Sequence, residues 1–508
     1  MDRLLHPRTI AVVGATDRHG SYAGQTLLNL ATLGYEGTVW GVNPGREEAH
    51  GVPCFPALSD LPSPPDAVVI ATPAAGVPAI VEEAGALGCG GAVVYGAGFG
   101  EIPDGVALER ELDAAARRHG LPLCGPNGNG IVALHERAAL WGDALRPLEA
   151  GRVAVVSQSG NLAVNALATQ RGLRLHTVIS CGNAAGLDVA EWVAQLAGEE
   201  GVGSIALYLE GDGDGPLLCE ALARCAENGV GVSVLKVGAS ALGALAAASH
   251  TGAVAGDQRV FRALVEEAGA AWAEDFHELL ELAKAHAVPG ARPRPSAGTG
   301  LAVLTCSGGD SALAADYCER SGLRLPALAA DTGQRLEELL PRAATVGNPL
   351  DYTALIWGEV ETLRDIVATV GEDPAIDQVV VLYDQPAGID GAAEESWSAV
   401  REGILAGAEG APVPVMVAST LPELLDDGAA ARFAEAGLPA IAGLRTGLVC
   451  AAALREPMGD PARLRAIAAA AGRGRNGRAP LAEHEAKELL RAAGVPVVEG
   501  RLAVGEDD

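Results

Sequence analysis

One pattern occurs three times along the chain: a short apolar run, a turn of small residues, and then a segment of helical character. The runs start at Thr9 with Thr-Ile-Ala-Val-Val-Gly, at Gly151 with Gly-Arg-Val-Ala-Val-Val-Ser-Gln-Ser-Gly, and at Gly300 with Gly-Leu-Ala-Val-Leu-Thr-Cys-Ser-Gly-Gly. A continuous apolar run of this length is typical of a strand buried on both faces of a parallel sheet. A strand that turns into a helix in this way predicts a βαβ unit.

Further apolar runs follow each of these starts. We expect strands at 37–42, 67–71 and 91–96 in the first cycle, at 177–180, 204–210 and 231–237 in the second, and at 378–383, 414–419 and 439–442 in the third. Helical segments such as Gln25 to Leu33 and Val77 to Leu87 lie between them. The pattern predicts an α/β chain of three consecutive doubly wound domains with mostly parallel sheets.

Two linkers divide the chain. Residues 289–300 are rich in proline and glycine, and residues 472–478 read Gly-Arg-Gly-Arg-Asn-Gly-Arg. The tail from 481 to 498 predicts one helix and one strand, which cannot bury a core by themselves. The length of 508 residues is consistent with three domains, because a domain typically has about 150 residues.

The composition excludes several classes of protein. A formal charge of −29 argues against nucleic acid or an anionic membrane as a partner. The 9 cysteines form no C-x-x-C pair, so we expect reduced thiols, a cytoplasmic location and no zinc site. No apolar run reaches the length of about eighteen residues that spans a bilayer, and the N-terminus does not have the architecture of a secretory signal.

The turns after the second and third repeated strands are candidate phosphate sites. Ser159 and Gly160 follow one strand, and Gly308 and Gly309 follow the other. Each turn leads into a helix, whose first N–H groups and positive dipole end attract anions. The alternative is that small residues only permit a tight turn. Neither segment has the Gly-Lys-Ser/Thr ending of a Walker A motif.

The first cycle carries a different set of breaker residues at its strand ends. Its first turn, Gly14-Ala-Thr16, is not G-x-G-x-x-G, which disfavours a nicotinamide cofactor and an oxidoreductase. A ligand that contains a diphosphate remains plausible, since doubly wound sheets bind ligands at the carboxyl ends of their strands. The candidate positions are Gly14, Thr16, Asn43, Pro44, Thr72, Gly96, Gly98 and Asn127.

Glu210 and His250 are the candidate catalytic residues. Glu210 ends an apolar strand, so its carboxylate should reach the same cleft as the turns, whereas His250 lies among small residues in Ala248-Ser-His-Thr-Gly-Ala. A carboxylate bonded to one imidazole nitrogen fixes the tautomer and leaves the other nitrogen as a nucleophile. The alternatives are a solvent-facing glutamate and a histidine that caps or packs against a helix.

With these motifs, the chain resembles the NDP-forming acyl-CoA synthetases of the succinyl-CoA synthetase superfamily, which include ADP-forming acetate–CoA ligases. The most specific match is Ala248-Ser-His-Thr-Gly-Ala, which resembles the phosphohistidine loop of that family. The resemblance implies a CoA-binding Rossmann-like domain at 1–142, a first CoA-ligase flavodoxin-like domain at 148–292 and a second at 298–462. Residues 476–508 resemble the start of an ATP-grasp domain or a linker to it.

The resemblance also implies roles. His250 would carry the phosphoryl group, Glu210 would orient it, and the two helix N-termini would hold the phosphate. Coenzyme A would bind at the strand ends of the first domain. ATP or ADP and Mg would belong to an ATP-grasp domain that is missing here or supplied by a partner, in a homo- or hetero-oligomer that acts on a small carboxylic acid.

Two departures from the family pattern stand out. Gly125-Pro-Asn-Gly-Asn129 replaces the usual Gly-Pro-Asn-Cys, and Asp310 follows Gly309 at a helix end that should bind an anion. Because most of the ATP-grasp domain is also absent from the resemblance, an alternative function is a regulatory or scaffold subunit that binds CoA or acyl-CoA without ligase activity.

Overall fold

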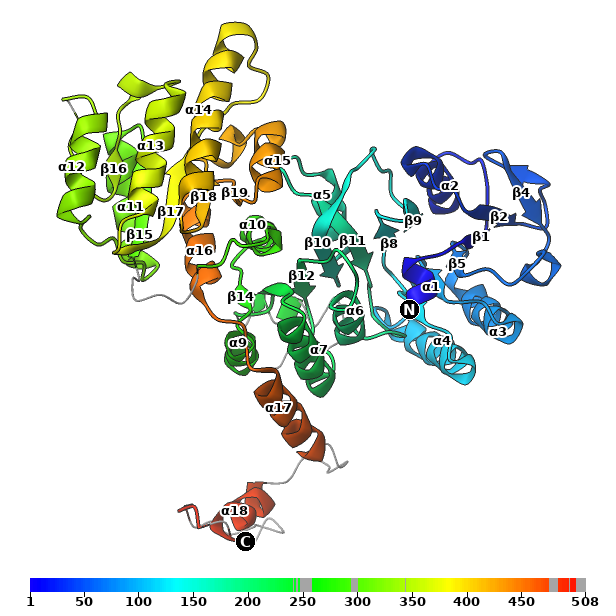
Figure 1. Cartoon of the computed structure of the whole chain (residues 1–508). Helices are drawn as coiled ribbons and strands as arrows, with labels where there is room; N and C mark the ends of the chain where they lie inside the picture. The colour runs from blue at the N-terminus through cyan, green and yellow to red at the C-terminus, as the bar shows by residue number, and fades with distance from the viewer. Residues whose placement is uncertain are drawn as a thin grey trace.

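The computed structural model describes residues 1–240, 242–243, 245–246, 258–293, 300–342, 344–474, 483–492 and 494–498. Figure 1 shows three α/β units in a row, with the first in blue at one end and the third in green to orange at the other. Each unit has a mostly parallel sheet with helices packed against it. The predicted fold class is confirmed.

The first sheet has the order β3-β4-β2-β1-β5-β6-β7. Its strands are β1 (Thr9–Val13), β2 (Thr38–Val42), β3 (Glu48–Ala49), β4 (Val52–Phe55), β5 (Ala67–Ile70), β6 (Ala92–Val94) and β7 (Leu123–Cys124), and its helices are α1 (Asp2–Leu5), α2 (Tyr22–Leu33), α3 (Val77–Leu87) and α4 (Val106–His119). β1 lies between β2 and β5 and is parallel to both. The strand order therefore reverses beside β1, as in dinucleotide-binding folds.

The second sheet has the order β14-β13-β12-β10-β11-β8-β9. Its strands are β8 (Gly130–Ala133), β9 (Ala138–Trp141), β10 (Ala150–Ser157), β11 (Leu175–Ser180), β12 (Ser204–Leu209), β13 (Gly231–Lys236) and β14 (Ala271–Trp272), with helices α5 (Gly160–Ala168), α6 (Val189–Leu196), α7 (Gly215–Glu227), α9 (Gln258–Glu267) and α10 (Phe276–Ala287). From β10 to β14 the order is that of a flavodoxin-like sheet, with the switch point between β10 and β12.

A hairpin formed by β8 and β9 joins the first two units. The expected first domain, 1–142, includes these residues, whereas β8 pairs antiparallel with β11 and extends the second sheet. On the other side, the α2 residues Thr26 and Asn29 donate hydrogen bonds to the carbonyl of Trp141, at 3.1 and 3.0 Å. The chain order gives no sign of this pairing, because it depends on which sheet edge lies within reach after the chain folds.

The third sheet is entirely parallel, with the order β16-β15-β17-β18-β19. Its strands are β15 (Gly300–Thr305), β16 (Leu350–Asp351), β17 (Ile376–Leu382), β18 (Val415–Ala418) and β19 (Ala440–Ile441), with helices α11 (Gly308–Arg320), α12 (Ala330–Leu339), α13 (Val360–Gly371), α14 (Gly391–Gly410), α15 (Asp427–Glu435) and α16 (Leu444–Arg455). This order repeats the flavodoxin-like arrangement and puts a switch point between β15 and β17.

Helix α10 connects the second and third units. It is buried from Glu278 to Ala287, because it packs against β12 and β13 on one side and against α16 and β19 on the other. After α16 the chain returns to the second unit, where α17 (Pro461–Gly474) packs against α7 through ion pairs of Arg465 with Glu220 and Glu227. The second and third units are therefore connected at two places, through α10 and through α17.

The tail is only partly as expected. Helix α18 (Glu483–Ala492) forms where a helix was predicted. The strand expected after it is not seen in the described residues 494–498. Instead, the Gly494 and Val495 amides donate to the carbonyls of Arg491 and Leu490 at the end of α18.

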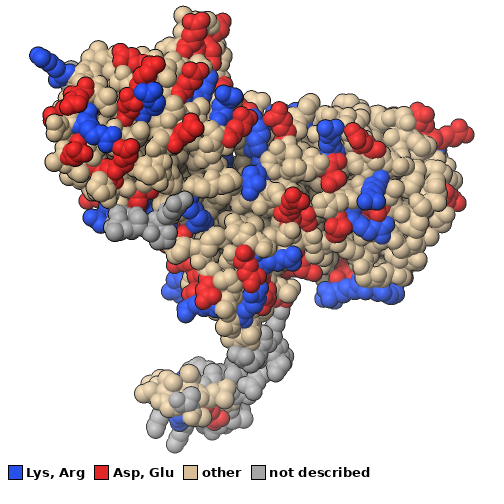
Figure 2. All heavy atoms as spheres, in the orientation of Figure 1, with Lys and Arg blue, Asp and Glu red and all other residues tan. Residues whose placement is uncertain are grey.

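The surface agrees with the acidic composition. On the face drawn in Figure 2, Lys and Arg side chains occur in small groups among Asp and Glu. Within the described segments, no helix combines the length and the apolar composition needed to cross a bilayer.

Candidate functional site

The carboxyl edge of the first sheet forms an open pocket of about 370 Å³. Four predicted residues line it: Gly14, Asn43, Pro44 and Thr72. Gly14 has φ +90°, and a Cβ there would lie 3.0 Å from the carbonyl oxygen of Ala71, so this turn requires glycine. The Asn43 side chain donates to the Ala15 carbonyl at 2.8 Å and accepts from the Gly45 amide at 2.9 Å, which fixes the two loops beside the pocket.

A second pocket, of about 260 Å³, lies farther along the same edge. Its lining includes the predicted residues Thr72, Gly96 and Asn127, and also Tyr22 and Tyr95, which sequence analysis did not single out. The two pockets share Thr72. The Thr72 hydroxyl is buried and has no hydrogen-bond partner among the described residues. A buried hydroxyl without a partner is costly, which suggests that a ligand completes it.

Two of the predicted site residues, Thr16 and Gly98, already form hydrogen bonds within the chain. The Thr16 hydroxyl accepts a hydrogen bond from the Arg18 amide at 3.2 Å. The Gly98 amide donates to the Glu101 carboxylate. Burial raises the pKa of Glu101, but this hydrogen bond and those from Asn183 and the backbone outweigh it, and the net pKa is lowered. The Gly98 amide is therefore already satisfied by an ionised side chain.

Glu210 lies at the switch point of the second sheet, directly after β12. Its residue is only 8% exposed. The side-chain oxygen of Gln158 accepts from the amides of Glu210 and Gly211, at 2.6 and 3.0 Å. Gln158 thus ties the end of β12 to the turn after β10. Sequence analysis missed this role, although a glutamine between two serines in a tight turn was a signal for it.

Ser159 and Gly160 begin helix α5 in the same turn. Ser159 is the N-cap residue, and its hydroxyl accepts from the Leu162 amide at 3.5 Å. A Cβ on Gly160 would lie 3.0 Å from the side-chain oxygen of Asn129. The N-terminus of α5 therefore faces both the end of β12 and the second pocket of the first unit, a position from which its amides can attract an anion.

The strand next to β12 ends in a buried lysine. The side chain of Lys236 is 1% exposed and lies 2.9 Å from Asp212, because burial of a charge requires a partner. Its carbonyl accepts from the side chain of Gln258 at 3.2 Å. This hydrogen bond joins Gln258, at the start of α9, to the end of β13 at the carboxyl edge of the second sheet. His250 belongs to residues 247–257, which lie outside the described part of the chain.

The corresponding turn of the third unit is bordered by carboxylates. Ser307 is the N-cap of α11, which begins at Gly308, and accepts from the Asp310 amide at 3.4 Å. A Cβ on Gly308 would lie 3.3 Å from an Asp351 carboxylate oxygen. Burial raises the pKa of Asp384, and the charge of Asp310 adds to this, although hydrogen bonds from Thr420 oppose it. Gly308 and Gly309 thus have acidic neighbours, which weaken the attraction of this helix end for phosphate.

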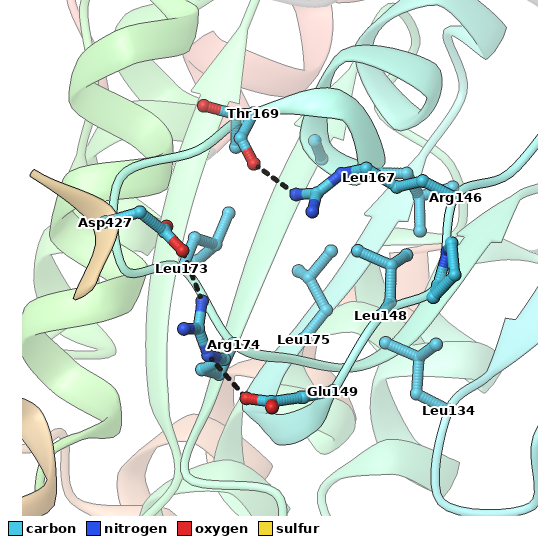
Figure 3. A pocket seen from close by; sticks show the side chains of 12 residues that line it. Leu134, Arg146, Leu148, Glu149, Leu167, Thr169, Leu173, Arg174, Leu175 and Asp427 are labelled. Atoms are coloured by element: carbon cyan, nitrogen blue, oxygen red, sulfur yellow. Dashed lines mark hydrogen bonds and ion pairs between the residues drawn. The ribbon is translucent and has the colours of Figure 1, made fainter. Parts of the chain in front are cut away.

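A further pocket, of about 230 Å³, lies at the opposite edge of the second sheet, where β10 and β11 begin. Figure 3 shows leucine side chains along its floor and two arginines at its rim. Arg174 is paired with Glu149 and Asp427, and Arg146 donates to the Thr169 carbonyl at 3.0 Å. Because ligands of doubly wound sheets bind at the carboxyl edge, this pocket is not the candidate site.

Two domain families match the chain. The succinyl-CoA ligase like flavodoxin domain matches residues 150–286, and a CoA binding domain matches residues 8–133. The first of these matches covers β10 to β14 of the second sheet, and the other covers the first sheet and β8.

Two relatives agree with these matches. ADP-forming acetate–CoA ligase I of Archaeoglobus fulgidus is 35% identical over 393 residues, which are 77% of this chain and 56% of the relative. The alpha subunit of ADP-forming acetate–CoA ligase II of Pyrococcus furiosus is 33% identical over 391 residues, which are 76% of this chain and 83% of the subunit. The chain thus spans about half the length of the first relative and most of the alpha subunit.

The solved structure of the dinucleotide-forming acetyl-coenzyme A synthetase 1 of Ca. Korarchaeum cryptofilum, in complex with phosphate and ADP, superimposes with a TM-score of 0.77 at 28% identity. The similarity covers 92% of this chain and 98% of that chain. The arrangement of all three units is therefore shared with this structure.

Proposed function

The chain belongs to the family of ADP-forming acetate–CoA ligases, and from this membership we propose that it carries the acyl-transfer part of an ADP-forming acyl-CoA synthetase. Such an enzyme interconverts a carboxylic acid, CoA and ATP with acyl-CoA, ADP and phosphate. The observation that carries the proposal is that two sites lie side by side: Glu210 and the N-terminus of α5 at the carboxyl edge of the second sheet, and the pocket of the first unit that contains Thr72 and Asn129.

Coenzyme A would bind along the first sheet. Gly14, Asn43 and Pro44 would hold the nucleotide end, where the glycine turn lets a diphosphate approach the backbone. Thr72 would donate its free hydroxyl to the middle of the molecule. The thioester end would then reach Asn127, near the turn that begins α5.

The chemistry would proceed in two transfers. First, an oxygen of inorganic phosphate attacks the thioester carbonyl carbon, the C–S bond breaks, and CoA leaves as a thiolate that takes up a proton. The product is an acyl phosphate. Next, an imidazole nitrogen of His250 attacks the phosphorus, the bond to the acyl oxygen breaks, and the carboxylate leaves. Phosphoryl transfer needs mainly positioning and charge complementarity, which the amides at the start of α5, from Gly160 onward, would supply.

Glu210 would act on His250 from the end of β12. A carboxylate there would stabilise the positive charge that the imidazole gains on attack. The phosphoryl group would pass from His250 to ADP on an ATP-grasp domain or partner subunit, where nucleotide and Mg would bind. The alpha-subunit relative from Pyrococcus furiosus supports a partner of this kind.

The test is phosphorylation of the full chain by acetyl phosphate labelled at phosphorus. We expect an acid-labile, base-stable phosphoprotein in the wild type and its loss in His250→Ala. Glu210→Gln should slow labelling by about a hundredfold, the typical cost of removing one electrostatic group from a transition state. The matched control is His119→Ala, because His119 is an exposed residue at the end of α4. Undiminished labelling of His250→Ala would refute the proposal.

A second candidate function has one observation in its favour. The carboxylates of Asp310, Asp351 and Asp384 border the α11 turn, which favours a regulatory or scaffold subunit that binds CoA but carries no phosphate. Such a subunit would bind CoA in the same experiment and remain unlabelled.

A further inference from the structure

The two pockets of the first unit form one path for a long ligand. Both pockets are lined by Thr72, whose buried hydroxyl has no hydrogen-bond partner among the described residues. The second pocket is the one beside the phosphate-binding turn, because its lining residue Asn129 lies within 3.0 Å of the Cβ position of Gly160. A thioester must meet phosphate to react, so the thioester end of the ligand belongs in the second pocket.

Aromatic rings form the wall of this second pocket. Tyr95 is 6% exposed and fixed by a hydrogen bond between its hydroxyl and that of Thr26, at 2.9 Å. Tyr22 is 55% exposed and packs edge-on against Tyr95, with ring centroids 6.0 Å apart and an interplanar angle of 74°. Tyr22 thus lines the pocket with an aromatic side chain that the protein covers only in part.

Gly142 limits the space opposite this ring. It lines the same pocket, and a Cβ there would lie 3.1 Å from the Tyr22 ring. Gly142 therefore packs directly against Tyr22, because even a Cβ would come closer to the ring than ordinary van der Waals contact. A larger residue would push the Tyr22 ring aside, and the ring has room to move because Tyr22 is 55% exposed.

The lining is also uncharged. The described residues around this pocket are tyrosine, alanine, threonine, glycine and asparagine, so a second carboxylate on the acyl group would find no cation there. An acetyl group would leave most of the pocket to water. A flat, uncharged ring would stack against Tyr22 and bury apolar surface on both sides.

We propose that the pocket between Tyr22, Tyr95 and Gly142 binds the acyl group of the thioester, and that it selects an uncharged aromatic acyl group over acetyl or a dicarboxylic acyl group. This inference rests on the proposed function, since it assumes that acyl-CoA is the ligand. It adds the substrate class, which neither the family nor the strand-end residues specify.

The experiment is calorimetric titration of the full chain with CoA, acetyl-CoA, succinyl-CoA and benzoyl-CoA. Benzoyl-CoA should bind about tenfold more tightly than acetyl-CoA, the usual gain from filling an apolar pocket with several more carbons. Succinyl-CoA should bind no more tightly than acetyl-CoA. In Gly142→Val and in Tyr22→Ala, the ratio of the two dissociation constants should fall toward one.

The control is Arg146→Ala, which alters the pocket at the opposite edge of the second sheet and should keep the wild-type ratio. Equal binding of benzoyl-CoA and acetyl-CoA by the wild type would overturn the inference, as would an unchanged ratio in Gly142→Val. If CoA binds without an aromatic preference, only this inference fails. If none of the four ligands binds, the proposed function fails with it.

Discussion

Removal of the Glu281 carboxylate should loosen the connection between the second and third units. Glu281 lies on α10 and is 0% exposed. Its carboxylate lies 2.7 Å from the Lys284 ammonium and accepts from the Ala442 amide of the third unit at 2.9 Å. Lys284 also donates to the Arg171 carbonyl at 2.7 Å. Burial lowers the pKa of Lys284, and the charge of Glu281 opposes this shift.

The magnitude follows from what Glu281→Leu leaves behind. The Lys284 ammonium would remain buried beside a neutral carbonyl, and an unpaired buried charge of this kind costs about 3–5 kcal/mol. For a cooperative unit of 150–250 residues, 1 kcal/mol corresponds to about 2–4 °C in Tm. Differential scanning calorimetry should therefore show a transition lowered by about 6–20 °C.

The double variant Glu281→Leu/Lys284→Leu separates the charge from the lost hydrogen bond. It removes both charges of the pair, and it leaves the buried Ala442 amide without an acceptor, which costs about 1–3 kcal/mol. The Arg171 guanidinium, which lies 3.4 Å from Glu281, is partly exposed and can turn to water. The double variant should thus be more stable than Glu281→Leu alone. A shift of less than about 2 °C in the single variant, or a double variant as unstable as the sum of both single changes, would refute this reasoning.

Two other predictions concern titratable groups. His6 has Glu136 at one ring nitrogen and Glu199 at the other, at 2.9 and 2.8 Å; burial lowers its pKa, but these hydrogen bonds outweigh burial and the net pKa is raised. The stabilisation that His6 gives the folded state is therefore full below the unfolded pKa of about 6.5, and it is lost as the pH rises through the folded pKa. In urea unfolding, His6→Ala should be less stable than the wild type near pH 5.5 and equally stable near pH 9. Cys54 and Cys306 are the partly exposed thiols, and burial raises the pKa of both. A thiol-specific colour reagent should react with these two before the buried cysteines, and the reaction should become faster as the pH rises. Early labelling of any other thiol would contradict the packing.

The fold could be predicted well where the chain itself carries a periodic signal. Strands β1, β10 and β15 are continuous apolar runs, and each begins within one residue of its predicted start. The short strands β3, β7, β14 and β16 have only two residues each. Their sequences carry no period, because they are strands only through the neighbours that they pair with.

Some residues of the candidate site could be predicted from the sequence, and others could not. Residues at strand ends, such as Gly14, Thr72 and Glu210, were identifiable because strand ends of parallel sheets share one edge. Gln158 was not, because its role depends on the backbone of a strand some fifty positions away in the chain. Nor was Tyr22, whose place in the second pocket depends on how α2 packs against the β8–β9 hairpin.

The amino-acid sequence by itself determined the three α/β units, the edge at which the candidate site residues gather, and the family to which the chain belongs, because these depend on local apolar runs and on short motifs. Only the tertiary structure decided which groups meet. It joined the hairpin of residues 130–141 to the second sheet, brought Asn129 to the Gly160 turn, and surrounded the α11 turn with carboxylates. These outcomes depend on side chains far apart in sequence, whose distances are fixed by packing and not by spacing along the chain.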